Sequence, residues 1–323
     1  MTLRYLAGRV AGMLGTLIGV AVVVFVVLRA LPGDTITAKL GTQAATLTAQ
    51  QRQALQHFYG LDASPVTQFF RWFGGLLHGD LGVSMDTGVP VTHLIGDALP
   101  VTLELAVLAM LIAVPLGVLF GMLAASRPGA VRDLSVQGVG LLGLALPEFV
   151  VATVTVAWLA SAFAYTPSAG TYVSLGESFS GNLRQMLYPA LVLAIGLTAT
   201  VMRTTRSAYL EAAGSDFVRT ARGKGLTEAR VRFRHILHNA GIPIVTMVGI
   251  QFGYLLGGTL VVEQVFALPG LGRLLLDGIL HQDYAIVQGV TLLVAAAFVV
   301  VNFAVDIVYR LLDPRTRSEG RRA

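Results

Sequence analysis

The 323-residue sequence contains no cysteine and few charged side chains. The absence of cysteine excludes disulfide bonds, thiolate metal sites and cysteine nucleophiles. Charged residues form 13% of the chain, whereas roughly a quarter of the residues in a soluble domain are charged. A protein of this size needs a polar surface in water, so this deficit and a hydrophobic content of 54% predict that the chain lies mainly in lipid.

The common nucleotide-binding and catalytic motifs are also missing. A phosphate-binding loop requires G-x-x-x-x-G-K-[ST], because its backbone amides and lysine hold the phosphates. The nearest segment, 218–225, lacks the first glycine and has Gly225 where the hydroxyl residue must stand. The chain has no H-E-x-x-H or G-x-S-x-G, and His235 and His238 lack a third ligand nearby. We therefore expect no catalytic site, metal or cofactor, and rank a membrane-embedded enzyme third among the candidate functions.

Long apolar runs are abundant, and a helix of about 20 such residues crosses a membrane. The first run has a basic flank like that of a secretory signal, but it is too long and lacks a small-x-small cleavage site. No alternating pattern indicates spanning strands. We predict an all-α membrane protein with six transmembrane helices, at 10–31, 99–124, 134–163, 187–202, 241–262 and 286–309.

Lysine and arginine are divided unevenly between the two sides of these spans. With the N-terminus inside, the inner segments carry 17 of them and the outer segments carry six. Such residues stay on the cytoplasmic side of short loops, so both termini are predicted to be cytoplasmic. Topology also explains the net charge of +5 without a nucleic-acid partner. The predicted parts are the N-terminus with the first span (1–31), an external segment (32–98), the permease domain (99–309) with a cytoplasmic loop (203–240), and a cytoplasmic tail (310–323).

The external segment carries the start signals of two helices. Thr48 and Gln51 form a capping-box pair, and the helix they open is expected to run to Tyr59. Ser64 and Pro65 indicate a second helix with an aromatic and apolar face over 69–77. We favour an interfacial helix at the lipid headgroups, with a docking face for an external partner as the alternative.

The cytoplasmic loop carries eight of the basic residues and the signals of two more helices. Ser215 and Thr227 are good N-cap residues, each followed by an acidic residue, and they predict helices at 216–223 and 228–239. Gly223 and Gly225 are expected to end the first helix. Two capped helices are more than a connector needs, so the loop is a candidate docking surface. By charge alone, a solvated positive-inside loop is the simpler explanation.

The predicted fifth span contains a ladder of small residues, Gly249, Gly253 and Gly257. Glycines four residues apart share one helix face and let another helix approach closely. Gly117 and Gly121 repeat this spacing in the second span. We expect these faces to pack against helices of this chain or of a second subunit.

One ionisable residue, Glu148, lies near the middle of the predicted third span, directly after Pro147. Proline frees backbone groups and kinks a helix, and a carboxylate at this depth must face a polar cavity or the bundle interior. Pro147 and Glu148 are therefore candidate residues of a substrate pathway. A structural ion pair of Glu148 is the alternative.

Several short motifs, spread over nearly the whole chain, form a pattern. They are L-R-A-L-P-G-D at 28–34, Y-G-L-D at 59–62, G-D-L-G at 79–82, L-P-V-T-L-E-L at 99–105, F-A-L-P-G-L-G-R at 266–273, D-Y at 283–284, V-Q-G at 287–289 and D-P-R at 313–315. Together they resemble the inner-membrane permease subunits of the dipeptide/oligopeptide/nickel group of ABC importers, specifically the B-type permease.

The segment D-F-V-R-T-A-R-G-K-G-L at 216–226 resembles the EAA loop of these permeases. In that family the loop forms a coupling helix seated in a groove of the ATPase subunit. Arg219, Thr220 and Ala221 replace the general Glu-Ala-Ala, and the terminal proline, Pro243, comes later than usual. The literal E-A-A at 211–213 lies upstream of the motif. The resemblance implies that the ATPase-coupling residues are Ser215, Asp216, Phe217, Arg219, Thr220, Ala221, Arg222, Gly223, Lys224, Gly225 and Leu226.

The resemblance also implies the type I ABC importer architecture, in a bacterial cytoplasmic (inner) membrane, working by alternating access. The expected partners are a second homologous permease, two cytoplasmic ATPases that bind ATP and magnesium, and an external substrate-binding protein. Peptides are the expected substrate, while nickel, opines, glutathione and sugars stay open because the binding protein largely selects the substrate. A secondary carrier or channel is the alternative class, but it would need inverted repeats and several ionisable residues at mid-membrane.

Overall fold

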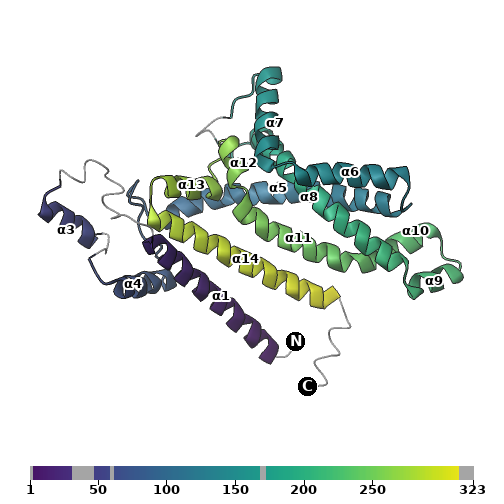
Figure 1. Ribbon diagram of the computed structural model, residues 1–323, viewed down its shortest axis with the longest axis horizontal. Coiled ribbons are helices and arrows are strands. Elements are labelled where there is room, and N and C mark those ends of the chain that lie inside the picture. The colour runs from purple at the N-terminus through teal and green to yellow at the C-terminus, as the bar shows by residue number, and fades with distance from the viewer. Residues whose placement is uncertain (1–2, 31–46, 59–61, 168–171, 313–323) are drawn as a thin grey trace. The chain divides into compact units, whose positions relative to one another are not determined.

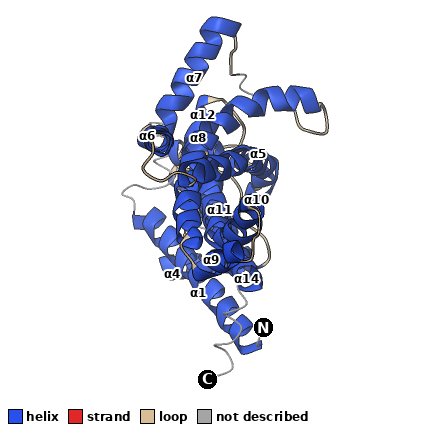
Figure 2. Ribbon diagram, turned by 90° about the vertical axis from the view of Figure 1, so that its right-hand side faces the viewer, coloured by secondary structure: helices blue, strands red, loops and turns tan. Residues whose placement is uncertain are grey.

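The computed structural model describes residues 3–30, 47–58, 62–167 and 172–312, and these residues are helical apart from short loops and one isolated β-bridge between Val83 and Pro90 (Figure 1 and Figure 2). The predicted motif residues within 31–34, 59–61 and 313–315 lie outside this description. The elements are α1 (Leu3–Ala30), α3 (Ala49–Phe58), α4 (Pro65–Leu77), α5 (Val91–Ala125), α6 (Val131–Ala145), α7 (Glu148–Phe163), α8 (Phe179–Ala213), α9 (Asp216–Gly223), α10 (Glu228–Arg230), the π-helix η2 (Val231–Leu237), α11 (His238–Gly258), α12 (Leu260–Val265), α13 (Leu271–Leu280) and α14 (Tyr284–Leu312).

In the described part of the chain, five helical segments are long and apolar enough to cross a membrane, and the pair α6–α7 is a sixth candidate if it is counted as one span. The predicted third span is therefore not one kinked helix, because α6 and α7 are bent by 92° at their junction. Pro147 has no amide hydrogen and disfavours a helical conformation in the residue before it. Leu146 accordingly has an extended backbone, with φ −77 and ψ 120.

Helical structure also extends beyond the predicted ends of other spans. Helix α8 runs from Phe179 to Ala213, where 187–202 was predicted, because its polar ends continue the helix beyond the apolar run. The predicted separation of a loop helix at 228–239 from the fifth span was wrong. Helical structure is continuous from Glu228 to Gly258, and Pro243 lies inside α11, since a spanning helix tolerates proline.

The chain divides into two compact units, one formed by Met1–Val101 with Pro269–Val299 and the other by Thr102–Leu268 with Val300–Ala323. In the first unit, the predicted capping box is confirmed by reciprocal hydrogen bonds between Thr48 and Gln51. Part of the aromatic face of α4 packs on α1: the Phe25 ring lies 5.3 Å from that of Phe69 and 5.6 Å from that of Trp72. Part of this face is thus covered by α1. Neither the predicted interfacial helix nor the alternative docking face had included this contact.

The D-Y motif at 283–284 has a structural role in the same unit. Asp283 is buried and accepts hydrogen bonds from the Ser84 hydroxyl at 2.7 Å and from the Ile286 amide at 3.3 Å. The second bond is the N-cap bond of α14. One carboxylate therefore starts α14 and holds the loop that precedes α5.

In the second unit, α8 packs against α6, α7, α11 and α12. It also contacts α5, because a Cβ atom at Gly117 would lie 2.6 Å from Cβ of Val201, and one at Gly121 would lie 2.6 Å from Cβ of Thr205. The small-residue face predicted in the second span is thus a contact between helices of this chain. Helix α8 forms the core on which the candidate sites are built.

Candidate functional site

Helix α9 has the predicted bounds, and Ser215 occupies its N-cap position with an extended backbone. The Ser215 hydroxyl does not cap the helix but donates to the Glu211 carbonyl at 3.2 Å. Asp216 in the first turn places a negative charge beside the free amides of the helix N-terminus. The start of α9 is therefore stabilised by charge rather than by a capping hydroxyl.

The end of α9 is a Schellman motif centred on Gly225. The Leu226 amide donates to the Ala221 carbonyl at 3.3 Å, and the Gly225 amide donates to the Arg222 carbonyl at 2.9 Å. Gly225 has φ +74, in the left-handed region that glycine adopts without steric cost. The predicted stop is confirmed: the helix ends at Gly223, and Gly225 turns the chain toward α10.

One face of α9 is fixed to the rest of the unit. Val218 and Ala221 are buried, and Leu226 packs on the cluster that they form with residues of α5, α8 and η2. The other members of this cluster are Ala125, Tyr209, Ala212, Val231 and Ile236. Because its apolar stripe is packed between longer helices, α9 is held as a rigid extension of α8 and η2.

The opposite face of α9 is exposed. The α9 surface, as we define it here, consists of Phe217, Arg219, Thr220, Arg222, Gly223 and Lys224, all exposed, with Phe233 of η2. Phe217 is 40% exposed and Phe233 is 62% exposed, which is unusual for phenylalanine outside lipid. Exposed basic groups on α9 and exposed aromatic rings on α9 and the adjoining η2 suit a partner with an acidic, partly apolar face.

An ion pair links α9 to the helix that follows. The Arg222 guanidinium donates to Glu228 with Nε–Oε1 at 2.9 Å, and both side chains are about half exposed. An exposed pair of this kind contributes about 0–1 kcal/mol, so it orients α10 more than it stabilises the fold. Arg219 and Asp216 form a weaker and more exposed pair at 3.6 Å.

The second candidate site, at Pro147 and Glu148, lies at the α6–α7 junction (Figure 1). Pro147 precedes the first turn of α7 and Glu148 begins it, and both side chains are exposed on this chain. Among the described residues Glu148 makes no salt bridge. A structural ion pair of Glu148, the alternative to a substrate-pathway role, therefore has no partner within the described part of the chain.

The predicted glycine ladder separates into different environments. A Cβ atom at Gly249 would collide with Cγ2 of Val305, so this glycine lets α11 approach α14 within the second unit. Gly253 is buried and Gly257 is exposed. Gly249 is therefore the ladder position with a demonstrated close helix contact.

Sequence reasoning missed a buried ion pair between α6 and α8. The Arg206 guanidinium donates to Asp133 through Nε at 2.7 Å and Nη2 at 2.8 Å, and the Asp133 side chain is 1% exposed. The Gly129 amide and the Gln137 side chain complete the bonding of this carboxylate. Arg206 had been counted as a loop residue because α8 was predicted too short, although an acid at the edge of an apolar run is a detectable signal.

Three further hydrogen bonds, to the carboxylates of Glu263 and Glu104, give a role to the polar residues of the L-P-V-T-L-E-L motif at 99–105. Glu263 of α12 is fully buried and accepts from the hydroxyls of Thr102 at 2.7 Å and Thr259 at 2.8 Å. Tyr172, in the loop before α8, donates to Glu104 of α5 at 2.6 Å. Burial and this hydrogen bond raise the pKa of Tyr172 well above its ordinary value, so the phenol keeps the proton that it donates.

Within the described part of the chain, no group of three or more His, Asp or Glu residues could hold a metal ion. The arrangement offers a protruding helix with a basic, aromatic surface and a helix break with an exposed carboxylate. Neither places a nucleophile next to a base.

Residues 117–318 match the sequence model of a family described as the binding-protein-dependent transport system inner membrane component, and residues 2–106 match the model of the N-terminal region of such membrane components. The di/tripeptide transport system permease protein DppB of Pseudomonas aeruginosa is 36% identical over 336 residues, covering 98% of this chain and 99% of the relative. The dipeptide transport system permease protein DppB of Escherichia coli K12 is 34% identical over 339 residues, with the same coverage. A Brucella abortus peptide transport system permease protein is 39% identical over 311 residues, covering 96% and 98%.

Two solved structures share the fold. An inward-facing MetNI methionine ABC transporter matches with a TM-score of 0.55 and 18% identity, over 68% of this chain and 96% of that chain. An amino acid ABC transporter with histidines matches with a TM-score of 0.50 and 20% identity, over 69% and 94%. These matches confirm the predicted all-helical membrane fold.

Proposed function

Because this chain belongs to the family of binding-protein-dependent transport system inner membrane components, we propose that α9 couples ATP hydrolysis by separate subunits to the passage of peptides. The chain is the multi-pass inner-membrane permease of an ABC system that imports peptides or dipeptides. It is not itself an enzyme and carries no cofactor. A binding-protein-dependent system implies ATPase and substrate-binding-protein partners.

The observation that carries the coupling proposal is the two-faced construction of α9. Val218 and Ala221 fix one face to α8 and η2, while the α9 surface stays open. A rigid helix held by two spanning helices passes on a push from outside as a rigid-body movement. The partner proposed to move α9 is an ATPase subunit that changes conformation during its nucleotide cycle.

The partner contact is proposed to be electrostatic at long range and apolar at short range. Arg219 and Lys224 steer an acidic groove toward the α9 surface. Phe217 and Phe233 then fill apolar hollows in it, as buried aromatic residues do in stable interfaces. The two ATPases, a second homologous permease and an external binding protein complete the proposed assembly.

We place the translocation path beside the α6–α7 junction. An interrupted helix at membrane depth is tolerated where protein or a water-filled cavity covers it, because lipid cannot satisfy its backbone groups. The exposed Glu148 next to Pro147 gives that cavity a fixed carboxylate. In alternating access, this junction would be reached from one side of the membrane at a time, between this chain and the second permease.

Uptake of labelled dipeptide by cells that express the whole transporter tests the coupling proposal. Lys224→Glu reverses a charge on the α9 surface, and Gly223→Pro breaks the last turn of α9. Both variants are expected to abolish uptake while the chain stays in the membrane at its normal level. Gly223→Ala and the charge reversal Arg184→Glu, at the outer end of α8, serve as controls and should transport normally.

Three results would overturn parts of this proposal. Normal uptake by Lys224→Glu and Gly223→Pro would remove the coupling role from α9. Uptake that persists without ATPase subunits would indicate the rival class, a secondary carrier. Competition by nickel, glutathione, opines or sugars, and not by peptides, would reassign the substrate without affecting the role of α9.

A further inference from the structure

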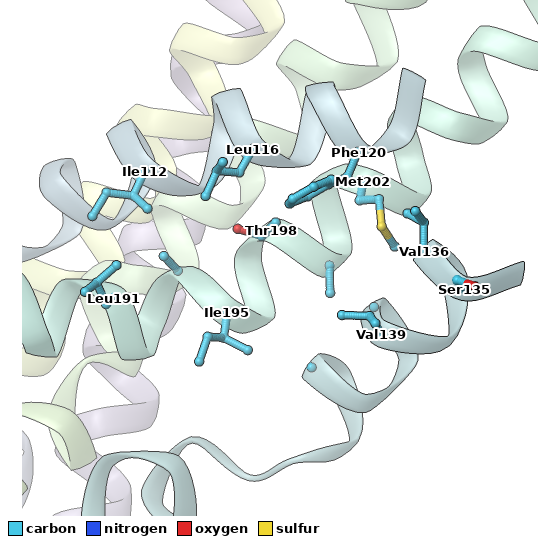
Figure 3. A pocket seen from close by; sticks show the side chains of 14 residues that line it. Ile112, Leu116, Phe120, Ser135, Val136, Val139, Leu191, Ile195, Thr198 and Met202 are labelled. Carbon is cyan, nitrogen blue, oxygen red and sulfur yellow. The ribbon is translucent and has the colours of Figure 1, made fainter. Parts of the chain in front are cut away.

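An apolar groove of about 420 Å³ lies between α5, α6 and α8, within the second unit (Figure 3). This volume falls within the range of roughly 300–1,000 Å³ that is typical of ligand sites. The lining residues are Ile112, Leu116, Phe120, Ser135, Val136, Val139, Gly140, Gly143, Leu191, Ala194, Ile195, Thr198, Ala199 and Met202. Two hydroxyl residues among fourteen cannot satisfy a peptide or a column of water, so the groove suits an alkyl chain.

The glycines of α6 shape the groove. A Cβ atom at Gly140 would collide with the Met202 methyl, and one at Gly143 would lie 3.3 Å from Cγ2 of Ile195. Because Gly140 and Gly143 have no side chains, a hollow remains between α6 and α8 beside these two close contacts. The hollow is therefore bounded by the side chains of Met202 and Ile195 where they approach the two glycines of α6.

One end of the groove is marked by positive charge. Figure 3 shows Ser135 and Val136 at the same end as Phe120 and Met202, with Ile112 and Leu191 at the other end. Arg132 precedes Val136 by four residues on α6, and Arg203 follows Ala199 by four residues on α8. Residues four apart share a helix face, so both arginines continue the lining at this end.

Among the described residues, neither of these arginines forms an ion pair. Arg132 and Arg203 are both exposed, and Arg132 contacts the Ser126 hydroxyl. Arg206, one turn beyond Met202, is already occupied by Asp133. Arginine excess marks the cytoplasmic side of the membrane, where the lipid headgroups carry negative charge.

We propose that this groove binds an anionic phospholipid of the cytoplasmic leaflet, with one acyl chain along α5, α6 and α8 and the phosphate at Arg132 and Arg203. A basic pocket at the cytoplasmic end of an interhelical groove is the arrangement that recognises such headgroups. A neighbouring helix is about 10 Å across and would insert only single side chains into this hollow. It would also leave the two arginines without an anionic partner.

Lipid retained by the purified transporter tests this site independently of transport. The full-length protein, extracted from membranes in native lipid discs, is analysed for phosphatidylglycerol and phosphatidylethanolamine by mass spectrometry. Each arginine near an anionic surface contributes about 1 kcal/mol, so replacing both by glutamine should lower retained phosphatidylglycerol by about fivefold for each arginine. Ile195→Trp, which fills the groove, should lower it as well, and Arg184→Gln, at the far end of α8, should not.

A photoreactive side chain at Val139 identifies the occupant directly. In vesicles of phosphatidylcholine with phosphatidylglycerol, the expected cross-link joins Val139 to lipid, and the Arg132→Gln, Arg203→Gln double variant should weaken it. A cross-link to a second permease would overturn the proposal and assign the groove to a subunit interface. Equal phosphatidylglycerol in all variants would overturn it as well.

Discussion

Gly225 shows how much the end of α9 depends on one residue. Its φ of +74 is strained for any residue with a Cβ, by about 1–2 kcal/mol. Gly225→Ala is therefore expected to loosen the end of α9. It should lower the free energy of unfolding of the extracted complex by about 1–2 kcal/mol and reduce uptake. Thermal unfolding and dipeptide uptake measure these two effects.

The neighbouring Gly223 provides a matched control for this prediction. It lies inside the last turn of α9, and a Cβ atom there would meet nothing within 4 Å. Gly223→Ala should leave stability unchanged or raise it by up to about 1 kcal/mol, because alanine favours helix. If both alanine variants unfold at the same temperature, the left-handed turn is not what stabilises α9.

The buried pair of Asp133 and Arg206 makes a second prediction at the scale of single residues. Asp133→Ala leaves Arg206, whose side chain is 23% exposed, without its carboxylate. Removing one partner of a buried ion pair lowers the free energy of unfolding by about 3–5 kcal/mol. Because Arg206 is partly exposed, we expect a decrease at the lower end of this range. The double change Asp133→Leu with Arg206→Met should recover most of the stability, as measured by thermal unfolding. A double variant no more stable than Asp133→Ala would contradict this.

At the scale of elements, the contact between α11 and α14 depends on Gly249. Any side chain there collides with Val305, so Gly249→Leu should push the two helices apart and lower stability and uptake. Gly249→Ala alone should lower stability for the same reason. Adding Val305→Ala removes the side chain that the new Cβ atom meets, so the double variant should regain much of the stability that Gly249→Ala loses. Gly241→Ala, where nothing lies within 4 Å, is the control. Equal stability of the Gly241 and Gly249 variants would show that the helices do not meet as described.

The helical elements also show how far local sequence predicts structure. The residue types at 215–216 and at Gly225 predicted the bounds of α9 correctly, because the charge of Asp216 and the left-handed turn at Gly225 act on backbone groups only a few residues away. The same logic located the break at Pro147 but could not supply its 92° angle. That angle depends on how α6 and α7 each pack on α8, which is a property of distant residues.

For the whole molecule, the testable feature is its orientation in the membrane. The chain contains no cysteine, so a single introduced thiol reports its own position. Lys224→Cys is expected to react with an impermeant maleimide from the cytoplasmic side alone, and Thr87→Cys from the external side alone. Labelling of Lys224→Cys from outside would remove α9 from the reach of any cytoplasmic ATPase.

Three things followed from the sequence alone: the helical membrane fold, the predicted side of the membrane for each loop, and the two ends of α9. Apolar run length, arginine distribution and helix caps are composition or short-range effects, so they can be detected without a fold. Only the tertiary structure paired Arg206 with Asp133 across 73 residues and Thr102 with Glu263 across 161. A buried carboxylate needs some partner, but which partner it meets is decided by how the helices pack, and no local pattern encodes that choice.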